Sequence, residues 1–294
     1  MKTKTLTASL ALAGLLGGSV ALNGQTIFAE NFDYALSNNT NIGGNTGGTW
    51  LGGTNNVRFV LNPGPSFTGT GYVAFHDGGS LESGNSNSSD VRTAHAPLGQ
   101  TVTGEFWVSA FVNPTQMTNI NGSVTQMSFS TGTTSNANYG GPGFGIYNSG
   151  TSLNYALFNG SAGVGGVTTV GTAATANQWQ LLIARITINE SADDAISLWS
   201  FAADADVPTT VAALGTPVVS STTVNWGNSI NTLGLGGQSF TTTGGKTALW
   251  DDLRLSISSG DTGLEDVLGI PEPSTYAALF GLLALGFVAW RRRR

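Results

Sequence analysis

The 294-residue sequence contains no cysteine and few charged residues. The lack of cysteine excludes disulfide bonds, thiolate metal sites and a cysteine nucleophile. Charged residues make up only 10% of the chain, whereas 40% of the residues are hydrophobic and 9% are aromatic. Disordered chains combine low hydrophobicity with high net charge, so this composition excludes wholesale disorder and predicts a sizeable buried core.

The middle of the chain also has few stretches of good helix formers. Short blocks rich in Thr, Val, Phe and Trp alternate with clusters of Gly, Asn and Ser, and glycine accounts for 42 residues. β-Branched and aromatic residues favour strands, whereas Gly and Asn favour turns, so we predict an all-β domain. The predicted strands are 26–32, 57–61, 71–75, 101–112, 124–130, 144–147, 153–158, 178–188, 196–201, 231–235 and 249–257.

The N-terminus has the features of a secretory signal peptide. Lys2 and Lys4 form a basic start, and an apolar stretch rich in Ala, Leu and Gly covers residues 6–22. Such a segment is removed during export, and its cleavage site needs a small residue. We place the cleavage after Gly24, with Ala21 as the alternative, so that residues 1–24 form a signal-peptide helix.

The C-terminus ends in an apolar run between a proline-rich motif and a basic cluster. Pro271, Glu272, Pro273 and Ser274 precede the apolar residues 275–290, and Arg291, Arg292, Arg293 and Arg294 follow them. A bilayer core of about 30 Å needs roughly 20 helical residues, so this run can span it if flanking residues reach the interfaces. The arginines would hold its end in the cytoplasm. The alternative is an ordinary membrane anchor.

This order of features closely resembles the PEP-CTERM sorting signal, which would cover residues 271–294. The resemblance implies that an exosortase, a transpeptidase-like membrane enzyme, recognises and processes the tail, in bacteria that make exopolysaccharide. It therefore implies export through the inner membrane, transient single-pass anchoring by the helix 275–290, and a final location at the cell surface or in the extracellular matrix.

The mature domain is strongly acidic. Removing both ends takes away six of the 11 basic residues and one of the 17 acidic residues. The mature domain then has five basic and 16 acidic residues, a net charge of −11. Such a surface repels phosphate backbones, so nucleic acid is excluded as a partner.

Short blocks at 28–34, 179–186, 196–199 and 250–256 resemble concanavalin A-like and laminin-G-like jelly rolls. The resemblance implies one β-sandwich domain over residues 25–259, followed by a spacer, 260–270, that leads to the tail. Folds of this type host lectins, glycosidases, lyases and inert spacers, so the fold does not select among these functions.

Two carboxylates stand in apolar rows of the predicted first and last strands. Alternation places Glu30 with Phe28, Phe32 and Tyr34, and Asp251 with Leu249, Leu253 and Leu255. A buried carboxylate needs a hydrogen-bond partner, a counter-charge or a metal. We predict either a Ca²⁺ ion shared by Glu30 and Asp251, or that each carboxylate accepts backbone N–H groups or meets an arginine such as Arg185 or Arg254.

The strand beginning at residue 101 offers a candidate carbohydrate contact. Phe106, Val108, Ala110 and Val112 share one face, while Glu105, Trp107 and Phe111 share the other. The second face is either a sugar-binding platform, in which an aromatic ring stacks on a sugar, or part of a second core; we favour the core.

No motif indicates catalysis. The chain has neither the paired acids of related glycosidases on one strand nor a nucleophile elbow, and His76 and His95 stand in polar contexts. We predict a non-catalytic surface or matrix protein that contacts extracellular polysaccharide. The alternatives are a carbohydrate-active hydrolase or lyase, and an inert structural protein. The one cofactor that the sequence suggests is the Ca²⁺ ion of the metal-site hypothesis.

Overall fold

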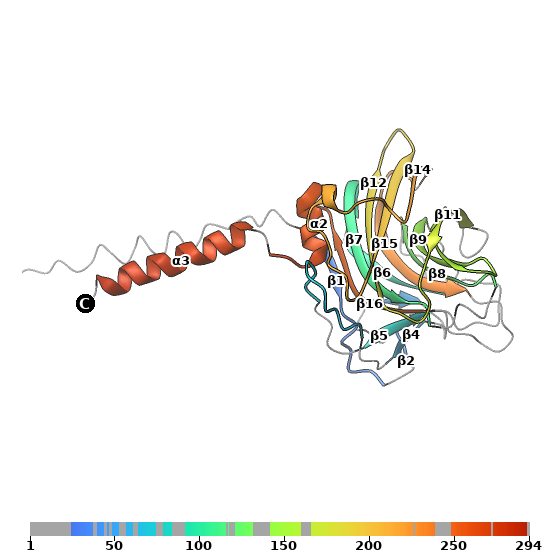
Figure 1. Ribbon diagram of the computed structural model, residues 1–294, viewed down its shortest axis with the longest axis horizontal. Coiled ribbons are helices and arrows are strands. Elements are labelled where there is room, and N and C mark those ends of the chain that lie inside the picture. The colour runs from blue at the N-terminus through green and yellow to red at the C-terminus, as the bar shows by residue number, and fades with distance from the viewer. Residues whose placement is uncertain are drawn as a thin grey trace, which may run out of the picture. The chain divides into compact units, whose positions relative to one another are not determined.

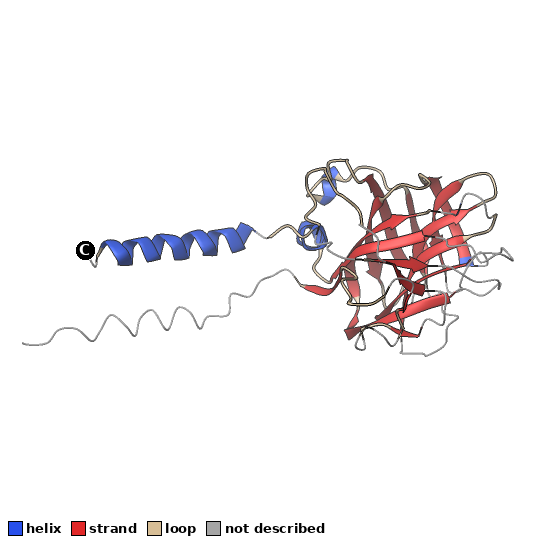
Figure 2. Ribbon diagram, turned by 90° about the horizontal axis from the view of Figure 1, so that it is seen from below, coloured by secondary structure: helices blue, strands red, loops and turns tan. Residues whose placement is uncertain are grey.

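The computed structural model consists mostly of β-strands (Figures 1 and 2). It describes residues 25–37, 40–43, 46, 49–52, 57–60, 64–74, 79–83, 92–115, 117, 121–131, 142–159, 166–225, 227–238, 248–271 and 273–292. The predicted signal peptide, residues 1–24, lies outside these ranges. The strands and the helix after them belong to one compact unit within residues 24–272, and the C-terminal helix belongs to a second unit.

The described strands form two antiparallel sheets. The first sheet contains β1 (Thr26–Glu30), β2 (Thr40–Asn41), β4 (Val57–Val60), β5 (Ser80–Ser83), β7 (Gly104–Asn113), β12 (Gln180–Ile188), β13 (Asp194–Ala202), β14 (Val219–Val224) and β16 (Ala248–Ser256). The second sheet contains β3 (Leu51–Gly52), β6 (Arg92–Val102), β8 (Val124–Ser130), β9 (Gly143–Asn148), β10 (Leu153–Phe158), β11 (Val167–Ala173) and β15 (Ile230–Gln238).

The strand order follows from antiparallel pairing of neighbours. The first sheet runs β14-β13-β12-β7-β16-β5-β4-β2, and β1 also pairs with β16. The second sheet runs β11-β10-β9-β8-β15-β6-β3. The two sheets pack face to face, which confirms the predicted all-β sandwich (Figure 1).

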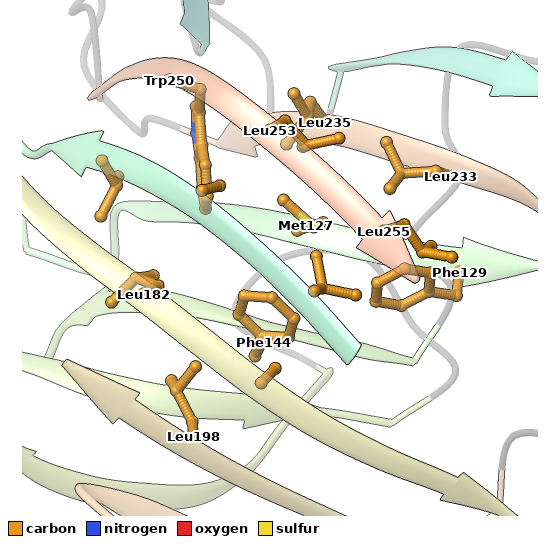
Figure 3. Packing of buried hydrophobic residues seen from close by; sticks show 14 of the residues in the cluster. Met127, Phe129, Phe144, Leu182, Leu198, Leu233, Leu235, Trp250, Leu253 and Leu255 are labelled. Atoms are coloured by element: carbon orange, nitrogen blue, oxygen red, sulfur yellow. The ribbon is translucent and has the colours of Figure 1, made fainter. Parts of the chain in front are cut away.

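The main core lies between the sheets and is built by alternation along each strand. In β7, the predicted face carrying Phe106, Val108, Ala110 and Val112 does point into this core. Burying one large apolar side chain contributes about 1.5–3 kcal/mol, so such rows dominate the stability of the sandwich. Figure 3 shows other members of the cluster: Met127, Phe129, Phe144, Leu182, Leu198, Leu233, Leu235, Trp250, Leu253 and Leu255.

The first and last strands, β1 and β16, pair with each other. The pairing of β16 with β7, however, contains one extra residue of β16 between Asp251 and Arg254, and Asp252 adopts a left-handed φ of 46°. This β-bulge changes which residues share a face. Trp250, Leu253 and Leu255 face the main core, so the predicted common face for Leu249, Asp251, Leu253 and Leu255 is wrong.

The predicted spacer, 260–270, is instead part of the folded domain. Residues Gly260–Leu268 form helix α2, which packs on the outer face of the first sheet. Leu264, Val267 and Leu268 are all fully buried there. Their i, i+3, i+4 spacing places them on one side of the helix, and the sheet residues beneath form the second hydrophobic cluster.

Other differences concern polar strands and one glycine-rich segment. The strands β2, β3, β5, β11 and β14, and all of β6 before residue 101, were not predicted because their sequences contain few large apolar residues. The predicted strand 71–75 is absent from its described part, residues 71–74. Gly71 has a φ of 81° and lies so close to the Val207 carbonyl that a Cβ would collide with it, so this segment follows a loop against Val207.

Candidate functional site

The predicted sorting tail begins directly where α2 ends. Gly269 follows α2 with a left-handed φ of 72°, and the Ile270 N–H donates to the Glu265 carbonyl at 3.0 Å. Pro271 is exposed, and Glu272 lies outside the described residues. Pro273 begins helix α3, a position where proline fits because no N–H donor is needed there. The motif therefore joins the two helices without a long connection.

The apolar run forms helix α3, Pro273–Arg291, which includes Ser274 in its first turn. Several of its large apolar side chains are exposed, among them Leu283, Phe287 and Trp290. Arg291 ends the helix, Arg292 follows it, and Arg293 and Arg294 lie outside the described residues. Within the described part of the chain, no helix combines the length and apolar character needed to cross a membrane. The predicted membrane span, 275–290, stays a prediction.

The proposed carbohydrate platform is buried. Trp107 and Phe111 have no exposed surface and belong to the second hydrophobic cluster beneath α2. The Trp107 ring stacks on Trp199, with ring centroids 6.1 Å apart and an interplanar angle of 16°. A covered ring cannot stack on a sugar, so the platform hypothesis is wrong for this arrangement and the core alternative fits.

Glu105, the third residue of that face, connects the sheet to α2. Its Oε1 accepts the Gly260 N–H at 2.7 Å and the Trp107 Nε1–H at 3.0 Å, and its Oε2 accepts Arg185 at 2.6 Å. Although partial burial raises the pKa of Glu105, the hydrogen bonds from Arg185, Gly260 and Trp107 lower it below its usual range. The ionised carboxylate caps the first N–H of α2, where the side chain of the N-cap residue Ser259 does not itself accept a capping hydrogen bond from the described helix.

Glu30 is satisfied by three hydrogen-bond donors. Its Oε1 accepts the Phe32 N–H at 2.8 Å, and its Oε2 accepts the Trp50 Nε1–H at 3.0 Å. The Tyr34 hydroxyl also donates to Oε2. Burial, together with this hydrogen bond and the Glu30 charge, raises the pKa of Tyr34 far above its usual value. One of these donors is a backbone N–H, as the alternative to calcium predicted, and the other two are side chains that we did not predict.

Asp251 lies fully buried near Glu30 and is a different case. Its Oδ1 accepts the Asp252 N–H at 2.7 Å, and its Oδ2 accepts the Ser80 hydroxyl at 3.2 Å. Burial, with smaller effects of the Asp252 and Glu30 charges, raises the pKa of Asp251 to about 8. Burial thus favours the neutral, protonated form of this carboxyl, which reduces its need for a counter-charge.

These carboxylates do not fit a shared Ca²⁺ site. Ca²⁺ takes six to eight oxygen ligands, whereas both oxygens of Glu30 already accept N–H or O–H donors. In the described ranges, no three His, Asp or Glu side chains gather where they could hold a metal ion. The two predicted arginines form ion pairs with other carboxylates. Arg185 binds Glu105, and Arg254 Nη2 lies 3.4 Å from Asp252 Oδ1.

A polar site that we did not predict lies on the outer face of the second sheet. Gln126 and Ser128 alternate with core residues along β8, so they point away from the core. On the neighbouring strands Gln126 pairs with Gly145 and Gly236, and Ser128 pairs with Gly143 and Gly234. We call these six residues, with His95, the Gln126 face. The glycines at alternate positions of two strands were the signal that could have indicated it.

The polar groups of the Gln126 face are buried and close to one another. A Cβ on Gly234 would lie 2.7 Å from Ser128 Oγ and 3.4 Å from His95 Nδ1, so these two side chains flank the glycine. Gln126 has no exposed surface, and within the described part of the chain neither its Nε2 nor its Oε1 has a hydrogen-bond partner. An unpaired buried polar group costs about 1–3 kcal/mol. The two N–H donors and the carbonyl oxygen of this amide could therefore all bind a water molecule or a ligand.

We expect Trp107→Ala to destabilise the domain by about 3–5 kcal/mol, because the substitution leaves a large cavity beneath α2. Trp179→Ala is the matched control, since Trp179 packs on the same cluster but is only partly buried. Chemical denaturation of both variants measures the difference. An equal, small loss for both would contradict the burial of Trp107.

We expect the stability of the wild-type protein to fall as pH rises from about 4 to about 8. The unfolded Asp251 loses its proton near pH 4, whereas the folded one keeps it to about pH 8, so the folded state binds the extra proton in this window. Asp251→Asn should remove this part of the pH dependence, and thermal unfolding across the window measures it.

The same unfolding series tests the metal hypothesis. If Asp251 is protonated, a chelator should leave the melting temperature unchanged at every pH. If Glu30 and Asp251 instead share Ca²⁺, the chelator should lower the melting temperature, excess Ca²⁺ should restore it, and Asp251→Asn should abolish this response.

Comparison with solved structures finds proteins of similar architecture. Endo-β-1,4-glucuronan lyase from the fungus Trichoderma reesei is 12% identical over 80% of this chain and 96% of that chain, with a TM-score of 0.47. An alginate lyase in complex with an alginate tetrasaccharide is 12% identical over 78% of this chain and 95% of that chain, with a TM-score of 0.45. The botulinum neurotoxin serotype D binding domain is 11% identical over 85% of this chain and 52% of that chain, with a TM-score of 0.43.

Sequence comparison identifies only the C-terminus. No curated protein matches the chain. The model of the PEP-CTERM protein-sorting motif matches residues 269–294, which confirms the predicted tail and starts two residues before its predicted first residue, Pro271. The chain therefore carries a PEP-CTERM protein-sorting motif at its C-terminus.

Proposed function

We propose that this protein is exported through the inner membrane, sorted through its C-terminus by an exosortase, and retained at the cell surface or in the extracellular matrix. The observation that carries the proposal is the motif match at residues 269–294. Signal-peptide removal after residue 24 frees the domain. The run 275–290 then anchors the chain in the membrane transiently, with Arg291–Arg294 on the cytoplasmic side.

The domain itself acts without catalysis, as a binding or structural component that contacts extracellular polysaccharide. Its buried carboxylates support this function, since Glu105 caps a helix and Glu30 accepts three donors. The carboxylates of Glu30 and Glu105 are both engaged in hydrogen bonds that stabilise the fold. A catalytic acid pair of a hydrolase would instead stand open to substrate.

The charge of the domain bears on the kind of polysaccharide. The mature domain carries a net charge of −11, so polyanions would be repelled and a neutral polysaccharide is the partner that we favour. The hydroxyl groups of such a polysaccharide can both donate to and accept from an amide. The Gln126 amide is buried, so it takes part only where this face is uncovered for the ligand.

Replacement of Pro271, Glu272 and Pro273 by alanine should leave export intact and block processing of the tail, because the enzyme reads the motif at the membrane boundary. The mass and cell fraction of the wild-type and variant proteins in the native host measure this. Equal processing of both would contradict the sorting assignment and leave an ordinary membrane anchor.

We expect Gln126→Met to weaken binding of a neutral polysaccharide several-fold, since each lost hydrogen bond is worth about 0.5–1.5 kcal/mol. The melting temperature should rise, because an apolar side chain of similar size replaces an unpaired buried amide. Ser220→Ala, an exposed position on the other sheet, is the control. Glycan binding and thermal unfolding measured together test this: higher stability with unchanged binding would assign Gln126 to an internal water.

A further inference from the structure

Helix α2 docks on the first sheet through a close apolar contact. Gly263 faces the Trp107 ring, and a Cβ at this position would lie 2.4 Å from Trp107 Cδ1 and 2.2 Å from the Ser258 carbonyl oxygen. Leu264, Val267 and Leu268 complete the buried side. The glycine thus allows the helix backbone to approach the indole, and the helix seals Trp107 and Phe111 from water.

Polar contacts fix both ends of the docked helix. Glu105 accepts the N–H of Gly260 at the start, as described above. At the other end, the Val267 carbonyl accepts the Ser109 hydroxyl at 2.7 Å, and the Leu268 carbonyl accepts the Val73 N–H at 2.8 Å. Each of these groups would lose its partner on undocking, so the position of α2 is well defined.

The fold extends through the first two residues of the sorting-motif match. The Gly269 N–H donates to the Asp266 carbonyl at 3.1 Å, and a Cβ on Gly269 would lie 2.3 Å from Arg254 Nη1. Ile270 is partly buried and packs on the second hydrophobic cluster. Because the match begins at residue 269, Gly269 and Ile270 serve both the domain and the sorting signal.

We infer that processing cuts the chain on the C-terminal side of Ile270 while α2 is docked, so that the mature protein ends just after this helix. This inference rests on the proposed sorting function. The cut breaks one backbone C–N bond: the carbonyl carbon passes to water or an amine acceptor, and the released tail keeps the nitrogen with a proton. The backbone of residues 260–270 is helical or capped by hydrogen bonds. A peptide bond must be freed from such contacts before an enzyme can cut it. A cut within α2 would also uncover Trp107 and Phe111.

The test is the C-terminal residue of the mature protein. The full-length chain is expressed in its native host, and the processed form is measured by intact mass and C-terminal peptide mapping. We expect one end at Ile270 or later, with the added mass identifying water or an amine as acceptor. An end before Ile270 would overturn the inference.

Undocking variants test whether α2 sets this boundary. Leu264→Asp places a charge in the buried cluster, and Gly263→Ala adds one methyl group against Trp107 while making the helix itself more favourable. Both should lower the melting temperature and yield a mixture of shorter C-termini from cuts within 260–270. Thr262→Ala, on the same helix but outside its buried side, should match the wild type. A single wild-type end in both destabilised variants would show that docking does not set the boundary.

The alanine replacement of residues 271–273 separates this inference from the sorting assignment. If that variant is processed like the wild type, the sorting assignment fails. If it is not processed and the wild-type end lies within α2, only the boundary inference fails.

Discussion

The central strands of the first sheet must be covered on both faces, and the rest of the structure depends on this constraint. In β7, Phe106 faces the core between the sheets, whereas Trp107 faces the opposite side. A sheet with two apolar faces needs a packed layer on each. The second sheet supplies one layer and α2 supplies much of the other. The domain can therefore bury a large apolar area without disulfide bonds.

Polar groups within these covering layers determine where each layer sits. Apolar burial contributes most of the free energy of docking, but it has no preferred direction. Glu105 and Ser109 project from β7 and bind opposite ends of α2, and Trp250 Nε1 donates to Thr125 Oγ1 at 2.8 Å between the sheets. Because an unpaired buried group costs about 1–3 kcal/mol, any shifted arrangement that broke these contacts would be less stable.

Features encoded locally were predictable from the sequence, whereas those that depend on distant partners were not. The sorting tail and the two faces of β7 follow from motif order and from alternation. The bulge at Asp252 is invisible to alternation because one extra residue reverses the pattern. A helix as short as α2 is marginal in isolation, since isolated helices of fewer than about 12–15 residues are unstable in water. Its docking partner, Trp107, lies far away in sequence.

The same reasoning explains why the carboxylates suggested a metal site that the structure does not support. A carboxylate in an apolar row requires a partner, but the sequence does not reveal whether that partner is a metal, a ligand or the protein itself. Glu30 and Glu105 find protein donors, and Asp251 resolves the requirement by holding a proton. Among the described residues, the side chain whose donor and acceptor atoms both lack a hydrogen-bond partner is instead the amide of Gln126, a neutral group between glycines. This neutral group lies on the sheet opposite the one that holds α2 and leads into the sorting tail.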